Sequence, residues 1–301
     1  QNVSVIALNI KNLKEIQSKK IRDYIEKAEF PKEMEEEILE AYETLGAEDF
    51  GLKNKPAYDI LKKSPKAIFV AVRSSATTED LAEASFAGQQ DTYLNVKGEP
   101  ELITSIKKCF ASLFTSRATY YRNKKGFKHE QSSLAVIIQK MVDANKSGVV
   151  FSKDPSLGKD DVIIEAVWGL GEGIVSGQIS PDRYTVSEDS GELKLKKKEI
   201  AKKKIAITRD SSGKKEVVKL KDEISERQVL KEHEIKKLAE IALKLEKHYQ
   251  KPQDIEFAIE RENLYIVQTR PITTLEKKHE GGGKELKGEL ILKGLAASPG
   301  I

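Results

Sequence analysis

Polar and apolar residues alternate most regularly near the C-terminal end of the chain. The segments 254–260 (DIEFAIE) and 264–271 (LYIVQTRP) both alternate, as strands with one buried face do. The three residues between them predict the loop of an antiparallel hairpin. A loop of that length places Glu256 opposite Gln268 and Asp254 opposite Arg270, and the period of a strand puts all four side chains on one face.

The chemistry of this predicted face indicates a metal and a phosphate. Two carboxylates and an amide oxygen are ligands for a hard cation such as Mg²⁺, and a guanidinium beside them can clamp an anion. Two alternatives stay open at this point. A slip of one residue would pair Glu256 with Thr269 and disperse the set, and a solvated hairpin can carry a charged outer face without any ligand.

The rest of the chain predicts a mixed α+β protein. Helical patterns cover 13–28, 31–45, 101–124 and 225–250, and apolar runs typical of buried strands cover 67–72, 134–142, 148–152 and 161–166. The run 67–72 predicts a strand that ends at Arg73, directly before Ser74 and Ser75, and these groups are good donors to an oxyanion. Gly88, among small and polar residues, would let a ligand approach the backbone closely. The alternative is a Ser/Thr-rich surface loop with a turn glycine.

Composition restricts the partners. The chain has 52 Lys and Arg against 48 Asp and Glu, a net charge of +4, which does not demand nucleic acid. The lysine-rich run 194–204 lacks aromatic residues for base stacking and predicts a solvated edge strand. No apolar run approaches the length of about 18 residues that a membrane span requires. The single cysteine, Cys109, lies on an apolar helical stripe; no internal disulfide can form, which predicts a cytoplasmic protein.

Two motifs are informative for the chemistry they exclude. The segment 169–173 (GLGEG) follows a predicted strand, but Gly and Pro in 174–181 do not suit the long helix of a dinucleotide-binding fold, and no Gly-Lys-Ser/Thr marks a P-loop. We expect a flexible loop that lines the ligand cleft. The four histidines, His129, His233, His248 and His279, lie in strongly charged segments, and we expect them at the surface and not as phosphoryl acceptors.

Five motifs in a fixed order resemble one family, the nucleotide-binding domain of phosphoenolpyruvate synthases, whose relatives are pyruvate phosphate dikinase and the rifampicin phosphotransferases. The resemblance covers roughly residues 56–301. It rests on the segments 72–77 (VRSSAT), 85–90 (SFAGQQ), 139–142 (QKMV), 169–173 (GLGEG) and 267–271 (VQTRP). The wording SFAGQQ favours the synthase over the dikinase.

The resemblance implies an ATP-grasp-like fold of two lobes with Mg²⁺ and ATP in the cleft between them. Gln139, Met141 and Val142 would hold the adenine, and Arg73, Gly88 and Thr92 would reach the phosphates. Glu256 and Gln268 would bind Mg²⁺ with Asp254 in support, while Arg270 would neutralise the transferring phosphoryl group, so that Arg270 and Arg73 are the expected catalytic residues.

The resemblance also implies a longer reaction and further domains. The phosphoryl group would pass to a histidine of a downstream domain, and a pyruvate-binding domain of the same polypeptide would complete the conversion of ATP, pyruvate and water into AMP, phosphoenolpyruvate and phosphate. We expect an N-terminal lobe over 1–130, a second lobe over 131–276, and over 277–301 a linker and first strand of a swivelling phosphohistidine domain.

One departure and two alternatives qualify this prediction. The family places a phosphate-contacting lysine in a Gly-Gly-Lys segment near its N-terminus, and residues 1–12 contain no glycine. The alternatives are a related enzyme with another acceptor, such as the dikinase or an antibiotic phosphotransferase, and a nonenzymatic nucleotide-sensing module. The linker and strand predicted over 281–301 favour a multidomain enzyme over a sensor.

Overall fold

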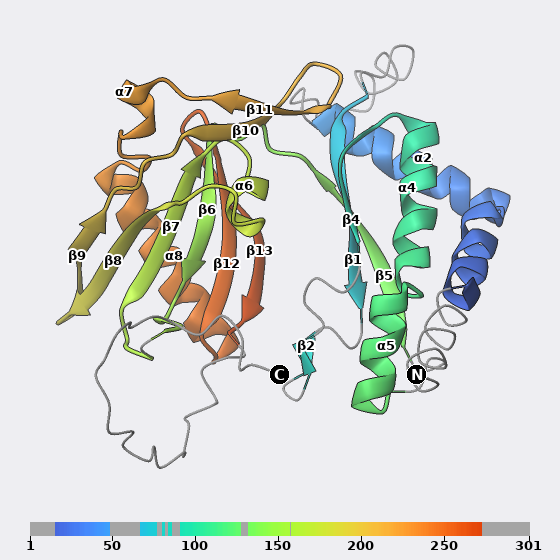
Figure 1. The fold of residues 1–301 in the computed structure, drawn as a ribbon, viewed down its shortest axis with the longest axis horizontal. Coiled ribbons are helices and arrows are strands. Elements are labelled where there is room, and N and C mark those ends of the chain that lie inside the picture. Colours follow the sequence, from blue (N-terminus) through green and yellow to red (C-terminus); the bar gives the residue numbers. More distant parts are fainter. Residues whose placement is uncertain are drawn as a thin grey trace, which may run out of the picture.

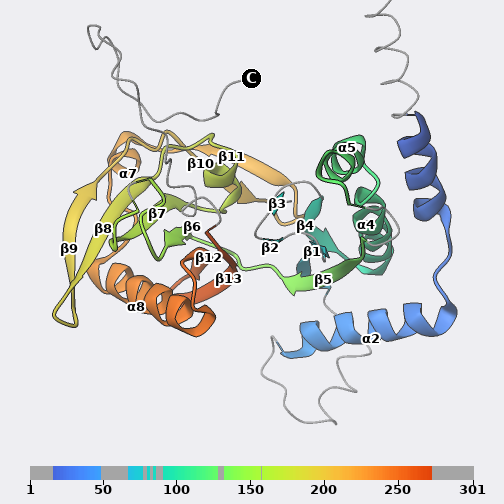
Figure 2. The same cartoon turned by 90° about the horizontal axis from the view of Figure 1, so that it is seen from below.

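The computed structural model describes residues 16–48, 67–76, 80–81, 84–85, 91–127, 132–156 and 158–272. These residues form a mixed α/β protein, as the hydrophobic pattern predicts. Two main sheets lie side by side, each covered on its outer face by helices (Figures 1 and 2). We call the part that contains the first sheet the N-terminal lobe and the part that contains the second the C-terminal lobe.

The N-terminal lobe is built on a three-stranded antiparallel sheet in the order β4-β1-β5. Its strands are β1 (Phe69–Ala76), β4 (Thr92–Lys97) and β5 (Leu134–Lys140), and its helices are α2 (Lys32–Glu48), α4 (Glu99–Ser112) and α5 (Ser116–Lys125). A further helix covers residues 16–27, and a separate two-stranded ladder pairs β2 (Asp80–Leu81) with β3 (Ala84–Ser85). Apolar side chains from one face of the sheet, α4 and α2 form the core of this lobe, which includes Cys109 as predicted.

Two predictions for this lobe need correction. The helix expected over 101–124 is two helices, because the side chain of Thr115 accepts a hydrogen bond from the backbone N–H of Ala118 and starts α5 anew. Arg73 lies inside β1 and not at its end, because β1 pairs with β5 as far as Ala76. Alternation along the strand therefore puts Arg73 and Ser75 on one face and Ser74 on the other.

The C-terminal lobe contains a six-stranded antiparallel sheet in the order β13-β12-β6-β7-β8-β9. Helix α8 packs across one face of it, and the shared core is rich in Val, Ile and Leu. The long helix expected over 225–250 begins only at Glu232, after a four-residue helix. The elements are β6 (Lys146–Phe151), β7 (Val162–Trp168), α6 (Glu172–Val175), β8 (Asp182–Asp189), β9 (Glu192–Glu199), α7 (Asp222–Ser225), α8 (Glu232–Tyr249), β12 (Gln253–Glu260) and β13 (Asn263–Pro271).

The predicted edge strand is confirmed as far as Glu199, whereas Lys203 of the same run is fully buried against Asp182, and the GLGEG segment differs from prediction. Strand β9 lies at the end of the sheet and carries the exposed lysines of the run that begins at Lys194. The segment 169–173, expected as a loop, leads into the short helix α6, and Gly169 has a φ of 81° with its Cα against the carbonyl of Ile207. A Cβ at Gly169 would lie 2.3 Å from that oxygen, so glycine is needed there.

A second hairpin, β10 (Ile205–Arg209) and β11 (Lys215–Lys219), forms a separate two-stranded sheet. Its first strand is attached to the C-terminal lobe, where the N–H of Leu170 donates to the carbonyl of Ile207 at 2.8 Å. Both views show the hairpin extending from that lobe toward β1 and β4 (Figures 1 and 2).

The division into domains stays a prediction, but the strand pairing bears on where a boundary would fall. Strand β5 follows residue 130 and yet pairs with β1 in the N-terminal lobe. The chain enters the second sheet at β6, so a boundary that follows the sheets lies in the linker 141–145 and not at 130. Residues 277–301 lie outside the described part of the chain.

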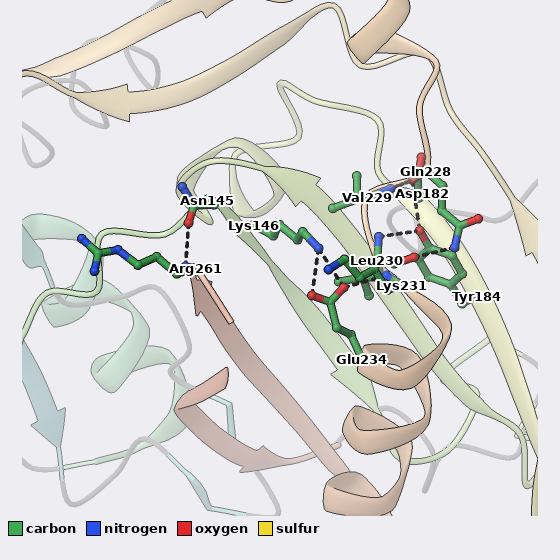
Figure 3. Close-up of polar contacts among 10 residues, drawn as sticks. All are labelled: Asn145, Lys146, Asp182, Tyr184, Gln228, Val229, Leu230, Lys231, Glu234 and Arg261. Carbon is green, nitrogen blue, oxygen red and sulfur yellow. Dashed lines mark hydrogen bonds and ion pairs between the residues drawn. The ribbon is translucent and has the colours of Figure 1, made fainter. Parts of the chain in front are cut away.

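Buried hydrogen bonds and ion pairs hold the starts of β6 and β8 in the C-terminal lobe (Figure 3). The carboxylate of Asp182 is fully buried, pairs with Lys203, and accepts hydrogen bonds from Tyr184 at 3.1 Å and from the N–H of Val229 at 2.8 Å. Burial raises the pKa of the Tyr184 hydroxyl. Lys146 donates to both carboxylate oxygens of Glu234 at 2.8 Å, which ties the start of β6 to the first turn of α8.

Two of the four histidines can be placed at the surface, as predicted. His233 and His248 are exposed on α8, whereas His129 and His279 lie outside the described residues. No helix in the described part of the chain is both long and apolar enough to cross a membrane.

Candidate functional site

The predicted pairing of the C-terminal hairpin is confirmed. Asp254 pairs with Arg270 and Glu256 with Gln268 in the β12–β13 ladder. The reason differs from the one that the sequence suggested. The turn has two residues and not three, because Glu260 pairs with Asn263.

A β-bulge at Val267 supplies the missing residue. Phe257 pairs with Ile266 and Glu256 with Gln268, so Val267 is the extra residue of β13. In a regular ladder counted from the two-residue turn, Gln268 would face Ile255 and point into the core. The bulge therefore keeps Gln268, and Arg270 after it, on the face of Glu256.

That face is the one turned away from α8. Ile255, Phe257 and Ile259 alternate with the polar residues of β12 and are buried against α8. Glu256 and Asp254 consequently lie on the other face, where their side chains are 34% and 15% exposed. The same strand that contributes to the core thus presents two carboxylates toward the N-terminal lobe.

Arg73 reaches this face from the N-terminal lobe. Its Nη1 donates to the Gln139 side-chain oxygen at 3.0 Å and lies 3.4 Å from the carbonyl oxygen of Val267. Its Nη2 donates to the side-chain oxygen of Gln268 and lies 3.8 Å from Oε2 of Glu256. Oxygens from β5, β12 and β13 therefore surround the guanidinium of a side chain that is only 17% exposed.

Gln139 makes a second bridge between the lobes. Its side-chain Nε2 donates to the carbonyl of Val267 at 3.1 Å, so this carbonyl accepts from both Gln139 and Arg73. Arg73 on β1 is opposite Ile137 on β5, and Gln139 lies two positions from Ile137. The side chains of Arg73 and Gln139 therefore share a face of the sheet. The bulge thus provides the backbone acceptor that joins β13 to the N-terminal lobe.

The remaining predicted residues take several positions. Thr92, the first residue of β4, is exposed and is opposite Arg73 of β1, so the two side chains lie on the same face. Met141 and Val142 begin the linker, and the N–H of Met141 donates to the carbonyl of Phe69 at 2.9 Å. Gly88 lies outside the described residues.

Asp254 and Arg270 are paired with each other. Nε and Nη2 of Arg270 both lie 2.8 Å from Oδ2 of Asp254, across the two strands. The pair is partly exposed, with 40% of the Arg270 side chain accessible. Arg270 therefore points out of the core, as predicted, with its orientation set by Asp254.

The oxygen donors of this face suit a hard cation only in part. Glu256 and Gln268 offer a carboxylate and an amide oxygen on adjacent strands, and Asp254 offers a second carboxylate one step along β12. Within the ranges that the structure describes, no group of three or more His, Cys, Asp or Glu side chains could hold a metal ion. A cation here would need oxygens from a ligand or water, which is how Mg²⁺ is usually bound.

Sequence reasoning missed two contributors to this face. Val267 acts through a backbone carbonyl, which has no signature in the sequence. Glu165 lies on the same sheet face, because Glu256 is opposite Val149 and Val149 is opposite Glu165. Burial raises the pKa of Glu165, and its neighbour Arg183 at 3.5 Å partly offsets that shift. The signal was available, since Glu165 interrupts an otherwise apolar strand.

Comparison with known proteins gives a consistent result. A family model described as "Pyruvate phosphate dikinase, AMP/ATP-binding domain" matches residues 3–287. The chain is 48% identical over 288 residues to a probable phosphoenolpyruvate synthase of Methanocaldococcus jannaschii, an alignment that covers 94% of this chain and 23% of that protein.

Two other relatives show the same partial coverage. A probable phosphoenolpyruvate synthase of Archaeoglobus fulgidus is 49% identical, with 94% of this chain and 36% of that protein covered. A phosphoenolpyruvate synthase of Pyrococcus furiosus is 45% identical, with coverage of 93% and 34%. The chain thus spans well under half the length of each of these relatives.

Deletion of Val267 separates the two roles of the bulge. A regular ladder without Val267 still places Gln268 opposite Glu256, but the carbonyl that accepts from Arg73 and Gln139 is lost. We expect the melting temperature to stay within a few degrees of the wild type, while trypsin cleaves faster at Lys140 and Lys146, which flank the linker. Val267→Ala keeps the carbonyl and should be cleaved at the wild-type rate. Unchanged cleavage of the deletion variant would contradict this role of the bulge.

Proposed function

The chain belongs to the family of pyruvate phosphate dikinase AMP/ATP-binding domains, and from this premise we propose that it binds Mg²⁺ and ATP between its lobes as the nucleotide-binding part of a phosphoenolpyruvate synthase. The observation that carries the proposal is the convergence on Arg73. Gln139 and Gln268, from two distant motif segments, contact Arg73 of a third, and Glu256, which is opposite Gln268 in the hairpin, lies beside them. A solvated hairpin with a merely charged outer face does not require such a contact.

The proposed arrangement is ATP-grasp-like. Two lobes of unequal size, each with its own sheet, meet through polar side chains such as those of Arg73 and Gln139, and this supports a nucleotide held between them. Arg73, Gly88 and Thr92 would bind phosphates from the N-terminal lobe. Gln139, Met141 and Val142, at the point where the chain leaves that lobe, would hold the adenine.

The exposed side chain of Ile137 supports a base site on the same face. Ile137 pairs directly with Arg73 on β5, and 49% of it is exposed although it is a large apolar residue. An apolar side chain beside a guanidinium suits a ligand that has both an aromatic ring and a phosphate tail, because such sites combine apolar walls with a few polar anchors.

Arg73 would change partners when nucleotide binds. In the structure its guanidinium donates to the side-chain oxygen of Gln268 and lies beside the carboxylate of Glu256. These are the oxygens proposed to bind the metal. Phosphate oxygens are strong acceptors for a guanidinium and would draw Arg73 away from this pair. Glu256 and Gln268, with Asp254 in support, could then ligate Mg²⁺ together with the phosphates, and the bound ion would neutralise phosphate charge.

Arg270 is proposed to act on the transferring phosphoryl group. It lies on the same strand face as Gln268, held by Asp254, and it is not needed to fill the core. Phosphoryl transfer depends mainly on positioning and electrostatic stabilisation, which fixed guanidinium groups supply. The acceptor would be a histidine of a downstream domain, because His233 and His248 lie on α8, which covers the opposite face of the sheet from Glu256 and Gln268. Pyruvate and water would enter the reaction elsewhere in the same polypeptide.

Calorimetry with purine nucleotides tests the proposal. We expect Mg²⁺-dependent binding of ATP and clearly weaker binding of GTP, because the linker backbone would pair with the adenine edge. Equal affinity for GTP would contradict the adenine assignment. Absence of binding by any purine nucleotide would contradict the proposed function.

The substitution Arg73→Met tests the exchange of partners. The variant should lose affinity for ATP by about tenfold or more. Without nucleotide it should bind Mn²⁺ severalfold more tightly than the wild type, because a positive charge beside Glu256 is gone. Titration of Mn²⁺ by electron paramagnetic resonance measures this directly. Arg183→Met, which removes a guanidinium paired with Glu165 on the same face, is the matched control and should leave Mn²⁺ binding unchanged. No gain in Arg73→Met would refute the exchange.

The substitution Arg270→Ala, made in the complete protein, tests the transfer step. Removing one preorganised donor to the transition state typically costs about 10²–10³ in kcat, so phosphorylation of the downstream histidine should slow by that amount. The melting temperature should remain near the wild type, because partly exposed ion pairs contribute little to stability. Single-turnover transfer from γ- and β-labelled ATP measures the effect. Near-normal transfer together with a lowered melting temperature would show a structural role instead.

A further inference from the structure

One arginine outside the proposed site belongs to a strand attached to the C-terminal lobe, and its guanidinium contacts the N-terminal lobe and the linker. Arg209 is the last residue of β10, and the strand behind it is firmly attached to the C-terminal lobe. Ile207 is fully buried with Val167, Leu170 and Ile179, and its carbonyl accepts from the N–H of Leu170 at 2.8 Å. Arg209 therefore starts from a fixed position in the C-terminal lobe.

The side chain of Arg209 ends among residues of the N-terminal lobe. The centre of its guanidinium lies 4.5 Å from the centroid of the Phe69 ring. Its Nη1 donates to the side-chain oxygen of Asn95 at 3.5 Å, and its Nη2 lies 3.5 Å from Oδ1 of Asp143. The Arg209 side chain is only 11% exposed, so most of its surface is in contact with protein.

Each of these contacts falls at a structurally sensitive point. Phe69 begins β1, Asn95 has a φ of 60° where β4 departs from regular pairing with β1, and Asp143 lies in the linker. The turn of the hairpin also lies against Phe69, because a Cβ on Gly213 would be 2.3 Å from Cε1 of its ring. The hairpin thus contacts the ring of Phe69 through the side chain of Arg209 and through the backbone at Gly213.

The linker segment 141–142 is held on both sides by this docking. Before it, Phe69 accepts the N–H of Met141 through its carbonyl at 2.9 Å while its ring contacts Arg209. After it, Asp143 pairs with Arg209 directly. At the C-terminal end of the linker, the side-chain oxygen of Asn145 accepts a hydrogen bond from the backbone N–H of Arg261 at 2.7 Å (Figure 3). Movement of the hairpin would therefore move Met141 and Val142 relative to the C-terminal lobe.

We propose that Arg209 is a positioning residue that fixes the backbone of Met141 and Val142 and thereby sets the preference for adenine over guanine. The inference rests on the proposed function, in which this segment reads the base. Adenine and guanine present reversed donor and acceptor patterns on the edge that carries N6 or O6. A rigid backbone N–H and C=O rejects the reversed pattern because it leaves polar groups unpaired, whereas a loose segment can adapt to either base.

The substitution Arg209→Met tests the proposal in the complete protein. Methionine keeps an apolar stem against Phe69 and removes the guanidinium. We expect the Kd for ATP to rise about tenfold and the Kd for GTP to change less than threefold, so that the preference for ATP falls. Arg209→Lys, which keeps a cation over the ring, should restore part of the preference. Calorimetry gives both dissociation constants, and thermal denaturation shows whether the fold is intact.

Lys215→Met is the matched control, because Lys215 lies in the same hairpin but pairs with Glu172 of the C-terminal lobe at 3.2 Å. It should leave the ratio of the two dissociation constants unchanged. Asp143→Asn alters a side chain that is 70% exposed, so this variant should fold even if Arg209→Met does not. Like Arg209→Met, it should lower the ratio of the Kd for GTP to the Kd for ATP. A ratio unchanged in both variants would overturn the proposal while nucleotide binding stands. Failure of the wild type to bind any purine nucleotide would instead refute the proposed function.

Discussion

The guanidinium of Arg73 is the interaction on which the arrangement of the two lobes depends. In the described part of the chain the backbone passes from one sheet to the other once, through the linker 141–145. The rest of the alignment comes from side chains, and Arg73 contacts β5, β12 and β13 together. Hydrogen bonds to a charged group typically contribute about 1.5–3 kcal/mol each, and bonds from the same guanidinium to phosphate oxygens can match that contribution.

The local structure around Arg73 holds the groups that it contacts on the correct face. The bulge at Val267 turns Gln268 to the correct face and also supplies a carbonyl to Arg73 and Gln139. Deeper in the C-terminal lobe, the pair of Lys146 and Glu234 fixes the start of β6 to α8, and the buried pair of Asp182 and Lys203 joins the start of β8 to the segment before β10. Removing one partner of such a buried pair is strongly destabilising, because it leaves an uncompensated charge.

The sequence predicts the elements of this protein better than their ends and their connections. Alternation in 254–260 and 264–271 identifies the hairpin, because one face of it must pack against α8. The predicted register of this hairpin assumed a three-residue loop, whereas the turn has two residues. The bulge at Val267, which no residue type in the sequence indicates, restores the predicted pairing. The single helix expected over 101–124 is divided because a cap at Thr115 outweighs the continuing helical pattern.

The candidate site shows the same division between local pattern and distant contact. Motif resemblance selects Arg73, Gln139 and Gln268, and the structure brings them together, but periodicity alone gives no reason for strands of different sheets to meet. Arg209 escaped notice because its contacts with Phe69 and Asp143 join residues far apart in the sequence. Such contacts depend on the packing of whole lobes, which short-range pattern does not encode.

The burial of Cys109 makes this chain convenient for spectroscopic labelling. Cys109 is the one thiol in 301 residues, and it is fully enclosed in the core of the N-terminal lobe. A thiol reagent can reach it only when that core opens, so its rate of modification reports the stability of the N-terminal lobe separately from the other. Cysteines introduced on the surface of either lobe would accept fluorophores or spin labels ahead of it, and distances between the lobes can then be followed in a protein that keeps its native thiol.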